Sequence, residues 1–276
     1  MVTPVLTVRN LCKTYPHFRL EDVSFSLYPG ITGFIGRNGA GKTTTLSCLL
    51  DLVHPDSGEI EFFGQPYSAD PAGIRQRVGY ATGTTSFFPH KPLRVLTEVT
   101  RMFYERWDDK MYADLMERFA LNPDKTPSEL SSGMKVKYSI ATALSHHASL
   151  LILDEPTSGL DPASRADLLE VFLDLVDGEG VTIFFSTQIT SDLEDYAGRI
   201  LYIRDGRIAA DSALDAFVAQ YQLAYTDRKP PADLVLGTRR IRTGWVSLLR
   251  AGMAPPPDAK LTDANLSEIM ILQPAE

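Results

Sequence analysis

The sequence is short of cysteine and has no long apolar run, and both shortages limit what the chain can be. Its 276 residues include two cysteines, Cys12 and Cys48, without a CxxC spacing. Free thiols in a reducing compartment are therefore expected in place of a disulfide framework. No uninterrupted apolar stretch reaches the roughly 18 residues that a membrane span needs, so any work at a membrane would require spans from another chain.

Two further absences concern targeting and partners. The N-terminal residues MVTPVLTVRN lack the basic start and long apolar core of a signal peptide, so a cytoplasmic protein is expected. Lysine and arginine total 27 against 35 acidic residues, a net charge of −8. A nucleic-acid footprint normally requires excess positive charge, so no nucleic-acid partner is expected.

What is present is a series of short β-forming runs that alternate with helical segments. The two runs LLILD (150–154) and VTIFFST (181–187) are apolar at nearly every position, which is typical of parallel strands covered on both faces. Asp205-Gly206, between two β-prone arms at 200–210, predicts a two-residue hairpin. The other predicted strands lie at 5–8, 31–36, 59–64 and 78–81.

Two regions differ from this α/β pattern. Apolar residues at helical spacing and the lack of a convincing strand predict a helical insertion, placed at about 84–149. From about Ala216 the chain becomes rich in proline, glycine and basic residues, and we expect a small C-terminal appendage over 216–276. The predicted division is therefore a main domain over 1–215 followed by that appendage.

A phosphate-binding motif follows the strand at 31–36. The stretch GRNGAGKTT matches the G-x-x-x-x-G-K-[ST] pattern and precedes a helical segment, which is the context that the motif requires. Its glycines let backbone N–H groups turn toward phosphate oxygens, while the helix adds the positive end of its dipole. The motif consists of Gly36, Arg37, Asn38, Gly39, Ala40, Gly41, Lys42, Thr43 and Thr44.

The motif chemistry predicts a nucleoside triphosphate and a magnesium ion. Lys42 would reach the β- and γ-phosphates, and the Thr43 hydroxyl would bind Mg²⁺. The carboxylates that such a site needs end the strand LLILDE (150–155). Asp154 would hold Mg²⁺ through water, and Glu155 would polarise the attacking water.

The order GRNGAGKTT, LSSGM, LLILDEPTSGLDP and IFFST closely resembles the nucleotide-binding subunit of ATP-binding cassette (ABC) transporters, over roughly residues 2–215. The resemblance implies an α/β fold, the P-loop NTPase ABC cassette. That cassette has a RecA-like core, an antiparallel β subdomain, a helical insertion and, here, the C-terminal appendage. The LSSGM variant and the chain length look most like ATPases of ABC-2-type bacterial exporters for antimicrobial peptides, bacteriocins or drugs.

The resemblance also implies a dimer with two buried ATP molecules. Ser131, Ser132 and Gly133 would contact the ATP held by the other subunit, which is a second copy or a close homologue. Asp161 would communicate across that dimer, and Tyr15 would stack on adenine. Tyr15 as a core residue, and LSSGM as a plain helix cap, remain alternatives at this point. A separate ABC-2-type permease would hold the subunit at the inner face of the cell membrane.

The chain departs from the family pattern at Gln188, where a histidine usually follows Ser-Thr. Glutamine can donate one hydrogen bond to the γ-phosphate but cannot become a cation or relay a proton. Hydrolysis should therefore be slow, either naturally or because the residue was substituted to trap ATP. A plain role at the end of a strand is the remaining alternative for Gln188.

The second departure lies in VGYATG (78–83), where the family usually has a glutamine at the place of Gly83. Glycine has no side chain to contact Mg²⁺ or water, and Thr82, Thr84 or Thr85 are possible substitutes. Phe87 and Phe88 follow, near the groove in which the family receives a coupling helix of the permease. Core packing is the other interpretation of these two phenylalanines.

Two other functions compete with an exporter ATPase. Soluble ABC proteins of translation or DNA repair carry two cassettes, or long coiled-coil or zinc insertions, and neither fits 276 residues with two cysteines. A nucleotide-switched regulator with little turnover is kept open by Gly83 and Gln188.

Overall fold

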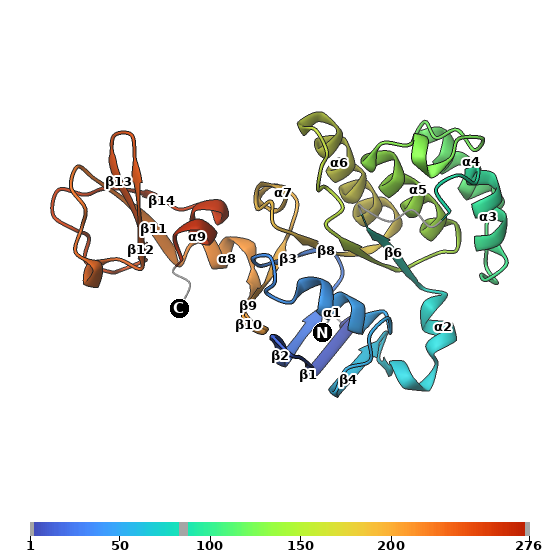
Figure 1. Ribbon diagram of the computed structural model, residues 1–276, viewed down its shortest axis with the longest axis horizontal. Helices are drawn as coiled ribbons and strands as arrows, with labels where there is room; N and C mark the ends of the chain where they lie inside the picture. The colour runs from blue at the N-terminus through green and yellow to red at the C-terminus, as the bar shows by residue number, and fades with distance from the viewer. Residues whose placement is uncertain (1–2, 83–87, 274–276) are drawn as a thin grey trace. The chain divides into compact units, whose positions relative to one another are not determined.

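The computed structural model describes residues 3–82 and 88–273 (Figure 1). The chain divides into two compact units. The first consists of Met1–Gln188 and Ile200–Asp211, and the second of Ile189–Arg199 and Ser212–Glu276. Each unit has its own sheet or sheets, so each is described separately.

A six-stranded sheet forms the centre of the first unit, in the order β10-β9-β3-β8-β7-β6. The pairs β3–β8, β8–β7 and β7–β6 are parallel. Every residue of β8 and the first four residues of β7 are buried, which confirms the prediction that these two strands are covered on both faces. The six strands are β3 (Ile31–Ile35), β6 (Val78–Thr82), β7 (Leu150–Asp154), β8 (Thr182–Thr187), β9 (Arg199–Arg204) and β10 (Arg207–Ala213).

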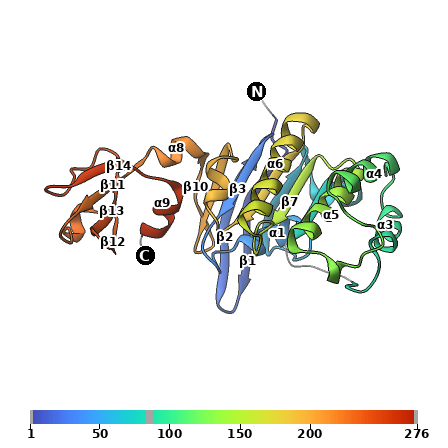
Figure 2. The ribbon, with the colours of Figure 1, turned by 90° about the horizontal axis from the view of Figure 1, so that it is seen from above.

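Helices cover both faces of this sheet (Figures 1 and 2). Helix α1 (Lys42–Leu49) contacts β7, and α6 (Pro162–Glu179) contacts β3 and β8. Beyond α1 lies an antiparallel sheet in the order β2-β1-β4-β5. Its strands are β1 (Leu6–Tyr15), β2 (Phe18–Leu27), β4 (Ser57–Phe62) and β5 (Gln65–Pro66), followed by η1 (Tyr67–Ala69) and α2 (Pro71–Arg75).

The main hydrophobic core joins the two sheets and α1. Phe25 of β2 lies 5.7 Å from Phe184 of β8 between ring centroids, and Phe34 of β3 lies 5.3 Å from Phe184. Leu46 and Leu49 of α1 belong to the same buried cluster. The core therefore fixes α1, and with it the start of the phosphate-binding loop, between two sheets.

The stretch 93–149 is helical, as its sequence predicts. It contains α3 (Leu93–Arg101), α4 (Asp109–Arg118), η2 (Pro127–Glu129) and α5 (Ser132–Ser145). The Asp108 carboxylate accepts a hydrogen bond from the Met111 amide, which caps α4. The predicted apolar stripe of α3 is only partly buried, because Val99 is 52% exposed and Phe103 lies beyond the end of the helix.

The turn between β9 and β10 is the hairpin predicted at Asp205-Gly206. Both residues have positive φ, +48° and +75°. The Gly206 amide donates to the Ala40 carbonyl at 3.0 Å, and the Gly206 carbonyl accepts from the Glu21 amide at 2.9 Å. A Cβ at Gly206 would lie 1.8 Å from the Arg19 carbonyl oxygen, so only glycine fits this turn.

The second unit is built on an antiparallel sheet in the order β12-β13-β11-β14. Leu223, Val246, Leu248 and Leu249 are among its buried apolar residues, and α9 packs on β12 and β13. The side-chain amide Nε2 of Gln273 donates to the Tyr221 hydroxyl at 3.0 Å. The elements are α7 (Ser191–Glu194), α8 (Leu214–Val218), β11 (Tyr221–Thr226), η3 (Ala232–Leu234), β12 (Gly237–Ile241), β13 (Gly244–Arg250), β14 (Lys260–Asp263) and α9 (Leu266–Leu272).

Within residues 3–82 and 88–273, no helix combines the length and the apolar character that a bilayer crossing requires.

Candidate functional site

At two positions of the loop between β3 and α1, Gly36 and Gly41, an added side chain would collide with a neighbouring strand. Gly41 has a φ of +116°, and a Cβ there would lie 2.6 Å from a Leu20 methyl carbon. A Cβ at Gly36 would lie 2.5 Å from the Ile203 carbonyl oxygen. The loop is thus pressed against β2 and β9, and it has a fixed shape immediately before α1.

Lys42, the first residue of α1, is 6% exposed. Its ammonium group donates to the Gly36 carbonyl at 2.7 Å and lies 3.5 Å from Oε1 of Glu155. A buried ammonium is stable only with such partners. These contacts hold the charge of Lys42 over the loop, where it could bind a phosphate.

The two carboxylates at the end of β7 occupy different surroundings. Asp154 accepts a hydrogen bond from the Thr43 hydroxyl at 3.1 Å through Oδ2. Glu155 has a positive φ of +50°, and its side chain is 24% exposed. Burial raises the pKa of the Glu155 carboxyl, and the nearby Lys42 ammonium opposes that rise. A carboxylate with a raised pKa beside a cation suits a general base.

Gln188 lies one residue beyond β8 and lines a cavity that Asp154 and Glu155 also line. Its backbone amide donates to Oε2 of Glu155 at 3.4 Å. The contact uses the main chain, so any residue except proline could make it at this position.

One cavity of about 610 Å³ brings most of the predicted site residues together. It is large enough for a nucleotide-sized ligand. Ten of its lining residues were predicted: Arg37, Asn38, Gly39, Gly41, Lys42, Thr43, Thr44, Asp154, Glu155 and Gln188. Four others also line it: His17, Phe18, Thr82 and Ser158.

The sequence did not identify Ser186, a fully buried residue beside this cavity. Its hydroxyl donates to Oδ1 of Asp154 at 2.5 Å. Ser186 is the partner of Asp154 in the β7–β8 register, and Thr82 is its partner in the β6–β7 register. Thr82, Asp154 and Ser186 therefore lie side by side across three strands, and only the strand order could have revealed this.

Among the described residues, five predicted site residues outside the loop do not line the cavity: Tyr15, Ser131, Ser132, Gly133 and Asp161. Tyr15 is 40% exposed, with the Lys13 ammonium 5.9 Å from its ring centroid. His17 and Phe18, two and three residues later, line the cavity in its place. Gly36 and Ala40 belong to the loop but are not lining residues; the Ala40 amide donates to the Arg37 carbonyl at 3.1 Å.

Ser131 and Asp161 both cap helices in this chain. The Ser131 hydroxyl accepts from the Met134 amide at 3.2 Å, so it caps the start of α5. Asp161 accepts from the Ala163 and Ser164 amides, each at 3.1 Å, at the start of α6. Hydrogen bonds from Ser164 lower the pKa of Asp161. Ser132 and Gly133 begin α5, and a Cβ on Gly133 would lie 3.3 Å from Leu160.

The family departure at Gly83, with Thr84, Thr85 and Phe87, lies outside the described residues. Phe88 is 67% exposed, which excludes core packing for this residue. Thr82 lines the cavity described above.

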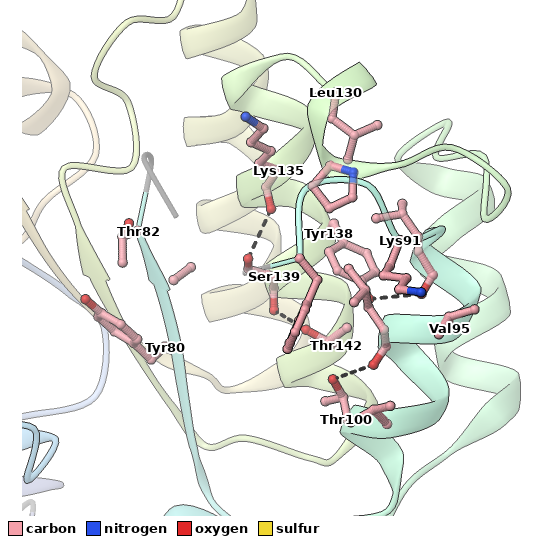
Figure 3. Close-up of a pocket in the computed structure, with 16 residues that line it drawn as sticks. Tyr80, Thr82, Lys91, Val95, Thr100, Leu130, Lys135, Tyr138, Ser139 and Thr142 are labelled. Atoms are coloured by element: carbon pink, nitrogen blue, oxygen red, sulfur yellow. Dashed lines mark hydrogen bonds between the residues drawn. The ribbon is translucent and has the colours of Figure 1, made fainter. Parts of the chain in front are cut away.

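A second cavity of about 490 Å³ lies between the central sheet and the helical stretch (Figure 3). Its walls are mainly apolar, and Phe88 is among the residues that line it. The Tyr138 hydroxyl donates to the Leu93 carbonyl at 3.3 Å across it. Figure 3 labels residues from three elements that line it: Tyr80 and Thr82 of β6, Val95 and Thr100 of α3, and Tyr138 and Ser139 of α5.

Comparison with known proteins gives consistent results. Residues 20–158 match the family described as ABC transporter. The chain is 34% identical to the bacitracin transport ATP-binding protein BcrA of Bacillus licheniformis, covering 78% of this chain and 71% of that protein. It is 35% identical to the Nod factor export ATP-binding protein I of Burkholderia orbicola (strain AU 1054), over 76% and 71% respectively. A solved structure of an ATP binding subunit of an ABC transporter is similar with a TM-score of 0.69 and 29% identity, over 78% of this chain and 92% of that one.

Proposed function

The chain belongs to the ABC transporter family as an ATP-binding subunit with the P-loop NTPase fold, and from this premise we propose that it hydrolyses ATP to power a membrane exporter. The names of two relatives contain "transport" and "export", which supports this direction. The nucleotide-binding domain of the proposal spans 1–215, with its helical part at about 84–149 and the appendage at 216–276.

The observation that carries the proposal is the convergence of the phosphate-binding loop, Asp154, Glu155 and Gln188 on one cavity. The loop comes from one strand end and the two carboxylates from another, and Gln188 follows a third. In an open parallel sheet, ligands bind at the carboxyl ends of the strands. Lys42 would neutralise the phosphates, Glu155 would accept a proton from water, and Gln188 would donate to the γ-phosphate.

The residues also fit a magnesium ion. The Thr43 hydroxyl oxygen and Oδ2 of Asp154 lie 3.1 Å apart, so a hydroxyl and a carboxylate oxygen are already adjacent. Hard oxygen donors of this kind suit Mg²⁺, which usually takes its other ligands from phosphates and water. Bound Mg²⁺ would neutralise charge on the phosphates.

We propose that two ATP-binding subunits act as a dimer, formed with a second copy or a close homologue. The cavity of the same subunit is not lined by Ser131, Ser132 or Gly133. The N-cap Ser131 is exposed, and amide groups at a helix start are suited to an anion. A γ-phosphate held by the partner subunit would satisfy them, with Asp161 near the same contact and Tyr15 placed to stack on adenine after a local rearrangement.

The proposed membrane partner is an ABC-2-type permease, which would hold the subunit at the inner face of the cell membrane. The second cavity and the exposed apolar side chains beside it fit a short permease helix: Phe88, Val99, Met102 and Phe103 are 67%, 52%, 83% and 72% exposed. Clusters of this kind mark interaction sites. The net charge of −8 gives no support to a nucleic-acid partner.

Any multi-span membrane protein encoded in a neighbouring reading frame is the partner to test, by co-expression with this chain. We expect the two chains to purify together from detergent, and ATP hydrolysis to depend on both Lys42 and Glu155. Membrane co-purification without any phosphate release would favour the alternative, a nucleotide-switched regulator. Nucleotide binding without a membrane partner would contradict the transport assignment.

A further inference from the structure

Ser186 is the next-to-last residue of β8 and has no exposed surface. Its hydroxyl makes two hydrogen bonds of opposite direction. It donates to Oδ1 of Asp154 at 2.5 Å and accepts from the Glu155 amide at 3.0 Å. A serine hydroxyl has one proton and two lone pairs, so both contacts can exist together. One oxygen atom therefore joins the two acidic residues of the site.

The first contact fixes the plane of the Asp154 carboxylate. Ser186 holds Oδ1, while the Thr43 hydroxyl donates to Oδ2 at 3.1 Å. Each of the two carboxylate oxygens thus accepts a hydrogen bond from a hydroxyl. With a donor on each oxygen, the carboxylate cannot rotate without losing a bond.

The second contact holds the backbone of Glu155 in an unusual conformation. The φ of +50° at Glu155 lies in the left-handed region, which non-glycine residues seldom adopt. The Glu155 amide donates to the Ser186 carbonyl at 3.1 Å as well as to the hydroxyl. This backbone shape directs the Glu155 carboxylate toward Lys42, 3.5 Å away.

We propose that Ser186 is a positioning residue that sets the metal-binding carboxylate and the general base relative to each other. The inference rests on the proposed ATPase function, because it concerns the orientation of Asp154 toward Mg²⁺. Removing a hydrogen-bond partner of a metal ligand typically lowers metal affinity or activity about 10–100-fold. Replacement by alanine leaves the Ser186 carbonyl in place, so the strand and one bond to the Glu155 amide survive.

The experiment measures ADP affinity by calorimetry, in EDTA and in excess Mg²⁺, for the full chain and for Ser186→Ala. Wild type should bind ADP more tightly with Mg²⁺. In the variant, affinity in EDTA should stay unchanged, and the gain from Mg²⁺ should fall about 10-fold or more. The turnover rate kcat should fall by a similar factor, with a smaller change in KM.

Ser145→Ala is the matched control, because Ser145 is also fully buried and its hydroxyl donates to the Ala141 carbonyl at 2.6 Å. It should keep the wild-type gain from Mg²⁺. An unchanged Mg²⁺ gain in Ser186→Ala, or an equal loss in the control, would overturn the proposal. If Ser186→Ala does not fold, Ser186→Cys takes its place, since a thiol has similar size but donates weakly. Wild type that gains nothing from Mg²⁺ would instead refute the proposed function.

Discussion

The ammonium nitrogen of Lys42 lies 3.5 Å from Oε1 of Glu155, so the cation assigned to phosphate and the carboxylate assigned to water are direct neighbours. The ion pair is largely buried, with the two side chains 6% and 24% exposed. The Lys42 ammonium opposes the rise that burial causes in the pKa of Glu155. A change at either residue should affect both nucleotide binding and hydrolysis.

Lys42→Ala should weaken ATP binding severely, because the γ end of the triphosphate loses its main cation. It should also raise the pKa of Glu155 further, since Lys42 is what opposes the effect of burial. Calorimetry with ATP measures the first effect. Lys110→Ala, on the exposed start of α4, is the control and should bind normally. Wild-type affinity in Lys42→Ala would remove the basis for the phosphate assignment.

Glu155→Gln should shift from monomer toward dimer when Mg-ATP is added, because hydrolysis no longer separates the subunits. The side chains are close in size, so the backbone at φ +50° should be retained. Light scattering measures the mass, and Mg-ADP is the control ligand. A strictly monomeric protein at saturating ATP would count against the assigned roles of Ser131, Ser132 and Gly133.

Gln188→His should increase turnover several-fold or more while ATP affinity changes little. Both side chains can hydrogen-bond a γ-phosphate, but the charge that develops in the transition state favours imidazole. Removing one such contact typically costs about 10²-fold in rate. The main-chain bond from Gln188 to Glu155 does not depend on the side chain. Steady-state phosphate release measures the change, and the pH profile should gain a titration. Equal rates would direct attention to Gly83.

Deleting residues after about 220 should leave nucleotide binding intact, although solubility can suffer. The described residues that line the nucleotide cavity all fall between His17 and Gln188. The deletion removes α9, whose Ser267 amide donates to Glu194 at 3.2 Å, so α7 loses a partner. Circular dichroism checks the fold, and calorimetry checks binding. A truncated chain that is folded but does not bind ATP would show that the appendage contributes to the site.

Acid should destabilise the protein partly through His146. Burial lowers the pKa of His146 below its ordinary 6.5. Its Nδ1 lies 3.0 Å from the Gln76 carbonyl and must donate to it, and its ring stacks on Tyr104. As pH falls below about 6.5, the unfolded chain gains a proton that the folded chain resists, so the free energy of unfolding decreases.

Urea unfolding between pH 7 and pH 5 measures this effect. His146→Gln should reduce the slope of stability against pH, although its stability at pH 7 will be lower. His90→Gln, at an exposed position, should keep the wild-type slope. Identical slopes in all three proteins would show that His146 titrates normally in the folded state.

The parts of this structure that the sequence predicted are those whose signal is local. The apolar runs at β7 and β8 and the loop Gly36–Thr44 are each contiguous, and strand burial or backbone shape follows from the residues themselves. The carboxylates Asp154 and Glu155 were found in the same way, because they stand at the end of one apolar strand.

The parts that were missed depend on residues far apart in the chain. Ser186 is 32 residues from Asp154 and reaches it only because β7 and β8 pair in one register. The sheet of the second unit was also missed, because its strands are short and are separated by prolines and glycines that suggest loops. Leu234 and Leu236 of this unit are only partly buried, whereas Leu248 and Leu249 are buried.

The turn at Asp205-Gly206 limits where this protein can be modified for laboratory use. A short hairpin of this kind would ordinarily be chosen for inserting an affinity tag or a fluorescent label. Here the Gly206 backbone bonds both to Ala40 in the phosphate-binding loop and to Glu21 in β2. An insertion would break those hydrogen bonds and disturb the phosphate-binding loop at Ala40. The two-residue turn between Ile241 and Gly244, in the other unit, is the better site for a label.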